Sequence, residues 1–462
     1  MKWVTFLKED PNGLYQPGET RYLNDDAAKK YLDKNIAVIH GWKCLRCGEG
    51  PIEQEKKPKI CPNPNCQSKT FKAFHPIEHD EVAQAIYQNI PIVAAEDNGE
   101  LWIYQNEGEN KGVYSNDIAE SVIKEKIKDL KPGCKQHFRN EVLDYIRIEN
   151  YISRKKLGLS ERKIAVKNGI LDLESRELEE FGPEKYVISK IPVKYDPDAE
   201  CPEIKKFIES LVGNGKDVNK IVEMIGYSLL RENPLNKAFM GLGPGENGRS
   251  TLFNLIQEFL GIKNVAGVDL TDLIYDRFAS ADLYGKLANM CADISDRKIK
   301  HSGRFKKQVG EDLIRAQHKN QDAFHFKNYA TPWFSANELP ETTDKTRSFY
   351  RRWVIINFPY TFTSDPEELE KEGYKEKNSD LPDSIITDKE LSGLLNWALN
   401  CLENVLGNKR FTNERTIEEK RELWELESDP VLEFIDTWCI EDKKKGEEYL
   451  KTLSVKLTGN FA

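Results

Sequence analysis

A glycine-rich run in the middle of the chain has the residue types and the spacing to hold a phosphate chain. It follows the apolar residues 238–242, precedes a segment of helical spacing, and reads Gly243-Pro244-Gly245-Glu246-Asn247-Gly248-Arg249-Ser250-Thr251. The order of strand, loop and helix and the spacing G-x4-G-[KR]-S are those of a P-loop, whose backbone N–H groups surround the phosphates of ATP. We expect the whole run to bind ATP and the Ser250 hydroxyl to bind Mg²⁺. A glycine-rich turn without a ligand is the alternative.

One residue departs from the usual P-loop pattern. Arg249 stands where a lysine normally reaches the terminal phosphates. Arginine keeps the positive charge and can hold a phosphate through two donors, but its planar guanidinium is larger and less adaptable than an ammonium group. We therefore expect Arg249 to act in catalysis, and we expect nucleotide binding to survive better than turnover.

Two acidic residues follow a strand-like segment downstream of the P-loop pattern. Residues 287–292 are apolar enough for a buried strand, and Asp293 and Asp296 come directly after it. A P-loop enzyme needs acids at the tip of a neighbouring strand, where they hold the metal and polarise the attacking water. We expect Asp293 to bind Mg²⁺ and both acids to serve catalysis. Acids of a surface loop would be the alternative.

The order of several segments resembles that of superfamily 3 helicases, and more narrowly that of the helicase half of the primase-helicases of poxviruses, phages, plasmids and archaeal mobile elements. The segments that carry this resemblance are residues 243–251, 286–296, 309–312, 334–340 and 349–353. Upstream, residues 165–173 and 193–196 resemble the domain that precedes the motor in that family. The resemblance covers about residues 80 to 430.

The resemblance implies roles for two further positions. Asn337 is similar to the sensor asparagine that orients the attacking water, a role that suits a side chain able to donate and accept. Arg352, with Arg351 as the second choice, is similar to the arginine finger that reaches the γ-phosphate bound by the adjacent subunit. Such a finger works only between subunits, so the resemblance implies a ring, normally a homo-hexamer. A turn asparagine and a surface charge pair are the alternatives.

A hairpin pattern and a basic run are the candidate contacts with nucleic acid. Residues 315–326 read as two short strands around a polar tip. In superfamily 3 helicases a hairpin at this place grips the backbone of single-stranded DNA, which makes His318 and Lys319 the DNA-binding candidates. Residues 297–307 contain six basic residues and no acid, and they form either a second contact or a solvated face.

Four cysteines near the start have the spacing of a metal site. Two residues separate the first pair, thirteen separate the pairs and four separate the second pair: Cys44, Cys47, Cys61 and Cys66. Two thiolate pairs on turns with a loop between them suit tetrahedral Zn²⁺, and a site closed by four thiolates is structural. The scattered thiols are expected in the core: Cys134, Cys201, Cys291, Cys401 and Cys439.

The elements that must position these residues alternate between strand and helix patterns. We expect an α/β fold in which a P-loop AAA+-like ATPase core with a parallel-rich sheet is preceded by a mixed α+β domain and an N-terminal zinc ribbon. The expected domains are an extension (1–40), a zinc ribbon (41–75), the mixed domain (76–234), the superfamily 3 ATPase domain (235–412) and a helical tail or incomplete winged helix (413–462).

Three smaller expectations concern single segments. Residues 191–195 are expected to form a strand, residues 364–379 a charged linker or insertion, and residues 416–428 a solvated helix.

The composition excludes several classes of protein. With 39% hydrophobic and 31% charged residues the chain should fold, and no apolar stretch approaches the ~18 residues of a membrane helix. The net charge of −9 means that any contact with nucleic acid must be local. The charged residues Lys8, Glu9 and Asp10 end the apolar opening before a signal peptide can form, so we expect a cytoplasmic protein.

The leading hypothesis is an ATP-dependent DNA helicase that acts in replication of a virus, plasmid or integrated element. It would translocate on single-stranded DNA and, because no primase site is apparent, work with a separate primase. The alternative is a nucleotide-binding assembly module that binds DNA but hydrolyses ATP weakly or not at all, because of Arg249. A zinc-ribbon transcription regulator is a third possibility, which only the cysteine cluster favours.

Overall fold

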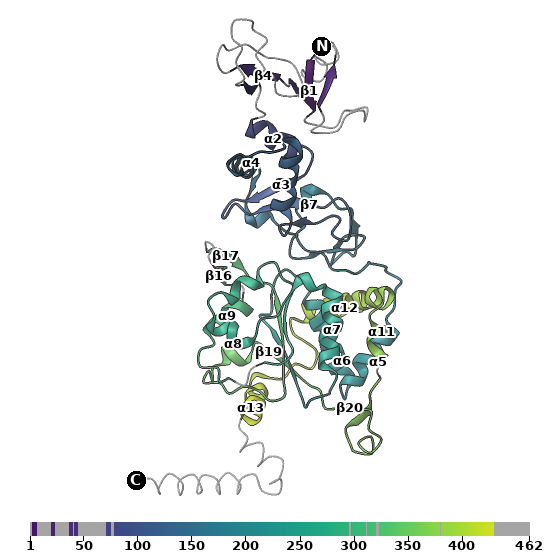
Figure 1. Ribbon diagram of the computed structural model, residues 1–462. Coiled ribbons are helices and arrows are strands. Elements are labelled where there is room, and N and C mark those ends of the chain that lie inside the picture. The colour runs from purple at the N-terminus through teal and green to yellow at the C-terminus, as the bar shows by residue number, and fades with distance from the viewer. Residues whose placement is uncertain are drawn as a thin grey trace, which may run out of the picture. The chain divides into compact units, whose positions relative to one another are not determined.

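The computed structural model describes residues 78–294, 297–310, 312–319, 323–378 and 380–428, and the backbone of five short strands before them (Figure 1). These strands are β1 (Lys2–Phe6), β2 (Thr20–Leu23), β3 (Ala37–Ile39), β4 (Gly41–Cys44) and β5 (Phe71–Phe74). They form a β2-β1-β3 sheet and a β4-β5 pair, both antiparallel. The chain divides into two compact units, one of residues 1–157 and 182–186 and the other of residues 158–181 and 187 onwards.

The first unit packs three helices against a small sheet. Its strands are β6 (Ile92–Ala95), β7 (Leu101–Tyr104), β8 (Tyr114–Ser115) and β9 (Tyr151–Ile152), in the order β8-β7-β6-β9 with β9 parallel to β6. Its helices are α2 (His79–Tyr87), α3 (Ala119–Leu130), α4 (Gln136–Glu149), η1 (Arg154–Lys156) and η2 (Pro183–Lys185). Ile123, Ile127 and Leu130 recur at helical spacing on α3 and are buried in the core of this unit.

The second unit is built on a five-stranded parallel sheet, which confirms the expected α/β fold with a parallel-rich sheet. The strand order is β14-β15-β18-β13-β19, and every neighbouring pair is parallel. The strands are β13 (Ala238–Leu242), β14 (Val265–Ala266), β15 (Ala288–Cys291), β18 (Thr331–Ala336) and β19 (Trp353–Asn357). Their side chains are almost all buried, as in a sheet that is covered on both faces.

Helices cover both faces of this sheet (Figure 1). Along β13, Phe239 enters the core formed with α5 (Pro202–Leu211), α6 (Gly215–Tyr227), α7 (Arg249–Leu260) and α12 (Asp388–Asn408). Met240, one residue on, enters the core formed with α8 (Leu270–Tyr275), α9 (Gly303–Val309) and α13 (Ile417–Glu427). Residues 187–234, which include α5 and α6, belong to the same compact unit as the sheet.

Two expectations for single segments were wrong. The helix expected to be solvated, α13, packs inward, with Trp424 only 1% exposed and its indole N–H donating to the Pro340 carbonyl at 2.9 Å. Residues 191–195 form no strand, although the Ile191 N–H donates to the Ala165 carbonyl at 2.9 Å and the Val193 carbonyl accepts from the Lys167 N–H at 2.8 Å. The isolated bridge beside them joins Ala165 to Lys190.

The remaining elements of the second unit are short. An antiparallel sheet contains β10 (Lys163–Val166), β11 (Gly169–Asp172) and β12 (Leu178–Glu179). An antiparallel hairpin contains β16 (Leu313–Ala316) and β17 (Phe324–Lys327), and a parallel pair contains β20 (Thr361–Thr363) and β21 (Tyr374–Glu376). The other helices are η3 (Ile262–Asn264), η4 (Ala279–Leu283), α10 (Arg347–Tyr350) and α11 (Leu381–Ile385). Among the described residues, no helix has both the length and the apolarity needed to cross a membrane.

Candidate functional site at the carboxyl edge of the sheet

A cavity of about 720 Å³ lies at the carboxyl ends of the central strands of the second unit. Its floor is the loop between β13 and α7, here called the glycine loop (243–248), together with residues that follow β15 and β18. Its walls come from α5, β20, the segment around β21, and α11. The carboxyl edge of an open parallel sheet is where α/β proteins bind their ligands, so this cavity is the candidate site.

The glycine loop adopts a conformation that needs glycine at two positions. Gly243 has a φ of +154° and Gly248 a φ of +79°. A Cβ atom on Gly243 would lie 2.4 Å from the Phe358 carbonyl oxygen, and one on Gly248 would lie 2.4 Å from Leu211 Cδ2. The Phe362 N–H donates to the Glu246 carbonyl at 2.8 Å and ties the loop to β20. The loop is therefore held in place from both sides, by the chain next to β19 and by α5.

The Arg249 side chain is turned into the protein, where it is only 8% exposed. Its Nε donates to Asn247 Oδ1 at 2.9 Å, and Nη1 donates to the carbonyls of Gly241, at 3.1 Å, and of Ala336. Its Nη2 donates to the Pro244 carbonyl at 3.2 Å and to Asn337 Oδ1 at 2.8 Å. A guanidinium has five N–H donors, and these bonds use all of them.

The acceptors around Arg249 are all neutral. Burial lowers the pKa of its guanidinium, and the negative charge of Asp293 opposes that shift. Because arginine stays protonated in proteins, the result is a buried positive charge beside the cavity.

The structure brings most of the predicted nucleotide residues together. Ser250 and Thr251 at the start of α7, Asp293 after β15 and Asn337 after β18 all line the same cavity. The side chains of Ser250, Asp293 and Asn337 are exposed to it. Asp296, the other predicted acid, lies outside the described residues.

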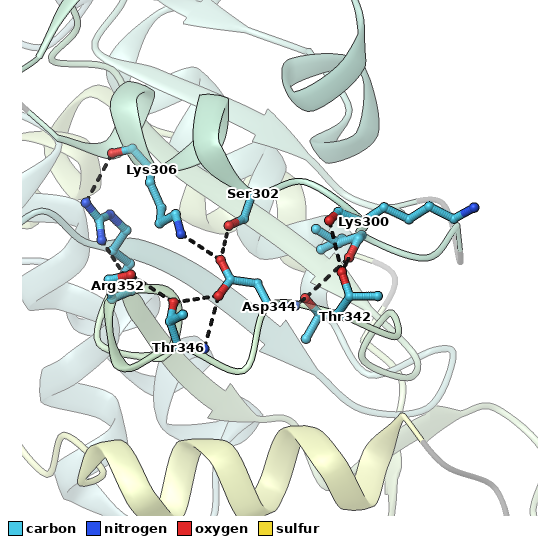
Figure 2. A network of polar contacts seen from close by, with 10 residues as sticks. Lys300, Ser302, Lys306, Thr342, Asp344, Thr346 and Arg352 are labelled. Atoms are coloured by element: carbon cyan, nitrogen blue, oxygen red, sulfur yellow. Dashed lines mark hydrogen bonds and ion pairs between the residues drawn. The ribbon is translucent and has the colours of Figure 1, made fainter.

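Arg352 does not line this cavity, and its role toward a neighbouring subunit stays a prediction. It is 8% exposed, its Nη2 donates to the Lys306 carbonyl at 3.2 Å, and its Nη1 donates to the Ser348 carbonyl (Figure 2). Burial lowers the pKa of its guanidinium, and the charge of Arg351 adds to this effect. The α10 turn directs Arg352 into the protein and leaves Arg351 exposed.

The Asp344 carboxylate accepts several hydrogen bonds near Arg352. Asp344 accepts hydrogen bonds from the Ser302 hydroxyl and, at 2.7 Å, from Lys306 Nζ, and its other oxygen accepts from the Thr346 N–H at 3.0 Å (Figure 2). Burial alone would raise the pKa of Asp344, but the hydrogen bonds from Lys306, Ser302 and Thr346 outweigh it and hold that pKa well below its usual range. These contacts join α9 to the connection between β18 and β19.

The predicted hairpin is confirmed as β16 and β17, and its two faces differ. Ile314, Ala316, Phe324 and Phe326 are buried. The opposite face is exposed and carries two cross-strand pairs, Leu313 with Lys327 and Arg315 with His325.

The predicted tip residues of the hairpin lie beside acids. His318 and Lys319 are exposed and border a second hollow, together with Asp272, Asp276 and Asp282.

The predicted zinc site lies outside what the structure describes. Cys47, Cys61 and Cys66 are outside the described residues, and of Cys44 only the backbone in β4 is described. Two of the scattered thiols behave as expected of core residues, because Cys201 and Cys401 are buried and burial raises the pKa of each to about 12.

Sequence reasoning missed one wall of the cavity. Phe362 on β20 and Lys375 and Lys377 around β21 line it, although the sequence suggested a linker or insertion there. Lys375 Nζ lies 3.2 Å from the centroid of the Tyr360 ring and donates to the Ser210 carbonyl at 2.8 Å, and burial lowers its pKa. The available signal was the alternation of Tyr360 to Thr363, which is typical of a short strand.

Two segments of the chain match known protein families. Residues 58–213 match the family described as "D5 N terminal like". Residues 242–352, which include the glycine loop, match a "family of unknown function (DUF5906)". Among curated proteins, an "uncharacterized mitochondrial protein ymf21" of Marchantia polymorpha is 27% identical over 140 residues, which cover 27% of this chain and 77% of the relative.

Among solved structures, the chain is similar to apo forms of the "NrS-1 C terminal region". One has a TM-score of 0.47 at 14% identity over 78% of both chains. Another has a TM-score of 0.48 at 14% identity, over 77% of this chain and 76% of the other. It is the "D5 N terminal like" match that supports a relationship of this chain to the primase-helicases of phages and viruses.

Proposed function

We propose that this chain is an ATP-dependent DNA helicase that acts in replication of a virus, plasmid or integrated element. The observation that carries the proposal is the convergence of the glycine loop, Ser250, Asp293 and Asn337 on one cavity at the carboxyl edge of a parallel sheet. The sequence predicted these residues as one phosphate site from separate segments. A chance arrangement would not be expected to bring all of them to the same place.

The cavity has the chemistry and the room for a nucleotide. Backbone N–H groups of the glycine loop and the start of α7 suit the phosphates, because a helix N-terminus and a loop of this kind favour anions. The far wall offers Phe207, Phe362 and Leu381, which are apolar surfaces suited to the base and ribose. ATP is thus the proposed ligand.

The residues present also fit the implied metals. The Ser250 hydroxyl and the Asp293 carboxylate are exposed oxygen ligands in the cavity and suit Mg²⁺, which neutralises phosphate charge when bound. Four thiolates are a donor set that suits structural Zn²⁺. In the proposed roles, Asp293 also polarises the attacking water and Asn337 positions it next to the γ-phosphate.

The proposed partners are single-stranded DNA, further copies of the chain in a homo-hexamer, and a separate primase. The exposed face of the β16–β17 hairpin supports the first of these, because Arg315 and Lys327 add positive charge to the tip residues His318 and Lys319. A phosphate backbone is bound mainly through such charges.

The test is steady-state ATP hydrolysis by the purified chain with and without single-stranded DNA. We expect hydrolysis that DNA stimulates and that falls on the order of 100-fold in Asp293→Asn, which removes a metal-binding charge but keeps the shape of the side chain. Asp129→Asn is the matched control, because Asp129 is exposed on α3 and lines neither hollow. Strand displacement on a forked duplex then distinguishes a helicase from a DNA-stimulated ATPase.

One observation favours the second candidate, a module that binds nucleotide without useful hydrolysis. All five donors of Arg249 are engaged within the protein, so its side chain does not offer the γ-phosphate the charge that a P-loop lysine supplies. Tight binding of a fluorescent ATP analogue with no turnover on any DNA would support this candidate and overturn the helicase.

A further inference from the structure

Arg249 makes a set of contacts that a lysine at the same position could not make together. Its acceptors belong to the end of β13, the glycine loop, the end of β18 and Asn337. A lysine ammonium presents its three donors from one point, whereas a guanidinium presents five in a plane. The arginine therefore links the loop to the neighbouring strand end through one side chain.

The contact with Asn337 fixes the orientation of that amide. A guanidinium only donates, so Asn337 must turn its Oδ1 toward Arg249, as it does at 2.8 Å. The Nδ2 group is then left as the donor available to a ligand in the cavity that Asn337 lines. Asn247 is oriented in the same way, with its Oδ1 accepting from Arg249 Nε at 2.9 Å.

We propose that Arg249 is a positioning residue that holds Asn337 in its working orientation and makes no contact with the phosphates. The inference rests on the proposed function in one respect, namely that Asn337 positions the attacking water or the γ-phosphate. It explains why arginine stands in place of the P-loop lysine: Arg249 holds the sensor asparagine in position instead of binding nucleotide.

The proposal predicts a split between catalysis and binding in Arg249→Lys. We expect kcat to fall on the order of 10- to 100-fold, because a misoriented amide loses a positioned donor. We expect the Kd for a fluorescent, non-hydrolysable ATP analogue to stay within about threefold, since no phosphate contact is lost. Arg410→Lys, the same change at an exposed position outside the cavity, is the control and should leave both values unchanged.

A double-mutant cycle tests whether Arg249 acts through Asn337. The cycle compares the kcat of four proteins: wild type, Arg249→Lys, Asn337→Ala and the double variant. If the arginine works through the amide, the double variant is no slower than Asn337→Ala alone. A Kd raised tenfold or more in Arg249→Lys, with kcat at saturation unchanged and effects that multiply in the double variant, would show a phosphate contact and overturn the proposal.

The same four proteins, without nucleotide, separate this inference from the proposed function. The contact between Arg249 and Asn337 exists in the ligand-free protein. The loss in Tm of the double variant should therefore be smaller than the sum of the losses of the two single variants. If the wild type hydrolyses no ATP, the helicase proposal fails, but the coupling in Tm still tests whether Arg249 positions Asn337. Additive losses in Tm would overturn the proposal that Arg249 positions Asn337, whether or not the protein is active.

Discussion

The glycine loop depends on particular glycines, and the dependence can be tested one residue at a time. We expect Gly243→Ala to abolish nucleotide binding and to lower Tm, because its Cβ would meet the Phe358 carbonyl oxygen at 2.4 Å where φ is +154°. A side chain in such a backbone conformation costs about 1–3 kcal/mol before the clash is counted. The measurements are thermal unfolding and titration with a fluorescent ATP analogue.

The matched control lies two residues away in the same loop. A Cβ atom on Gly245 would meet no protein atom within 4 Å, and the φ of Gly245 is not positive, so Gly245→Ala should keep the Tm of wild type. Equal losses in Tm in Gly243→Ala and Gly245→Ala would contradict the conformational argument, and so would no loss in either.

At the residue scale, the sequence predicted which side chains meet but not how they are used. Gly243, Asp293 and Asn337 could be placed together because each follows a strand and parallel strands end at one edge. The contacts of Arg249 could not be predicted, since its acceptors Gly241 and Ala336 are backbone carbonyls on different strands. Residue type alone gives no information on such acceptors.

The β16–β17 hairpin is the element to which DNA binding should be most sensitive. Charge reversal by Arg315→Glu or Lys327→Glu should weaken binding of single-stranded DNA about tenfold and lower the slope of log K against log salt by about one unit. The reason is the strand register, which puts both side chains on the exposed face. Fluorescence anisotropy at several salt concentrations measures both effects.

The control for the hairpin is a charge reversal far from it. Lys216→Glu changes the net charge equally at an exposed position at the start of α6. If Lys216→Glu weakens DNA binding as much as Lys327→Glu does, the effect is one of overall charge and the hairpin has no special role.

A buried group of charges around Lys420 of α13 should make stability depend on pH. Lys420 is 2% exposed and donates to Glu414 Oε1 at 2.5 Å, and Lys237 Nζ contacts the same carboxylate. Burial, together with the charge of Lys237, lowers the pKa of Lys420 to about 8. The unfolded chain keeps this proton up to its ordinary pKa of about 10.4.

The sign of the effect follows from these two values. Between about pH 8 and pH 10, unfolding takes up a proton at Lys420, so the stability of the folded state rises with pH in that window. We therefore expect the Tm of wild type to rise relative to that of Lys420→Met when the pH goes from 7 to 9.5. A Tm difference that is the same at both pH values would contradict the lowered pKa.

At the element scale, the sequence predicted best what is encoded locally. The apolar run of β13 gave the strand with its correct bounds, Ala238–Leu242. The pair of β20 and β21 was missed because each has three residues and their parallel pairing joins segments ten residues apart, which the short alternation at β20 does not reveal. The burial of α13 was missed because its two buried residues, Lys420 and Trp424, lie in a helix that is otherwise rich in glutamate.

At the scale of the whole molecule, the described residues on the floor of the cavity offer no free positive charge to the γ-phosphate, because Arg249 is fully engaged. The lysines that line the cavity belong to its walls: Lys206 pairs with Glu203 at 2.7 Å, Lys375 donates to Ser210, and Lys377 follows β21. Charge supplied by a second subunit would meet this need. Because Arg352 is buried and Arg351 is exposed, we propose Arg351 as the residue that supplies it.

Mixing two inactive variants tests whether this arginine acts between subunits. Asp293→Asn lacks a metal-binding charge in its own site, and Arg351→Ala lacks the charge offered to its neighbour's site, so each alone should hydrolyse ATP on the order of 100-fold more slowly. In a mixed ring, an Arg351→Ala subunit that lies next to an Asp293→Asn subunit regains a complete site. With equal mixing about a quarter of the sites are complete, so about a quarter of the wild-type rate should return. If Arg351 is the finger, Arg352→Ala keeps complete sites and hydrolyses ATP by itself, so mixing it with Asp293→Asn should only dilute its rate. An Arg352→Ala variant that is slow alone and gains rate on mixing with Asp293→Asn would return the role to Arg352. No gain in either mixture, with ring assembly verified by light scattering, would show that no arginine of this pair acts in trans.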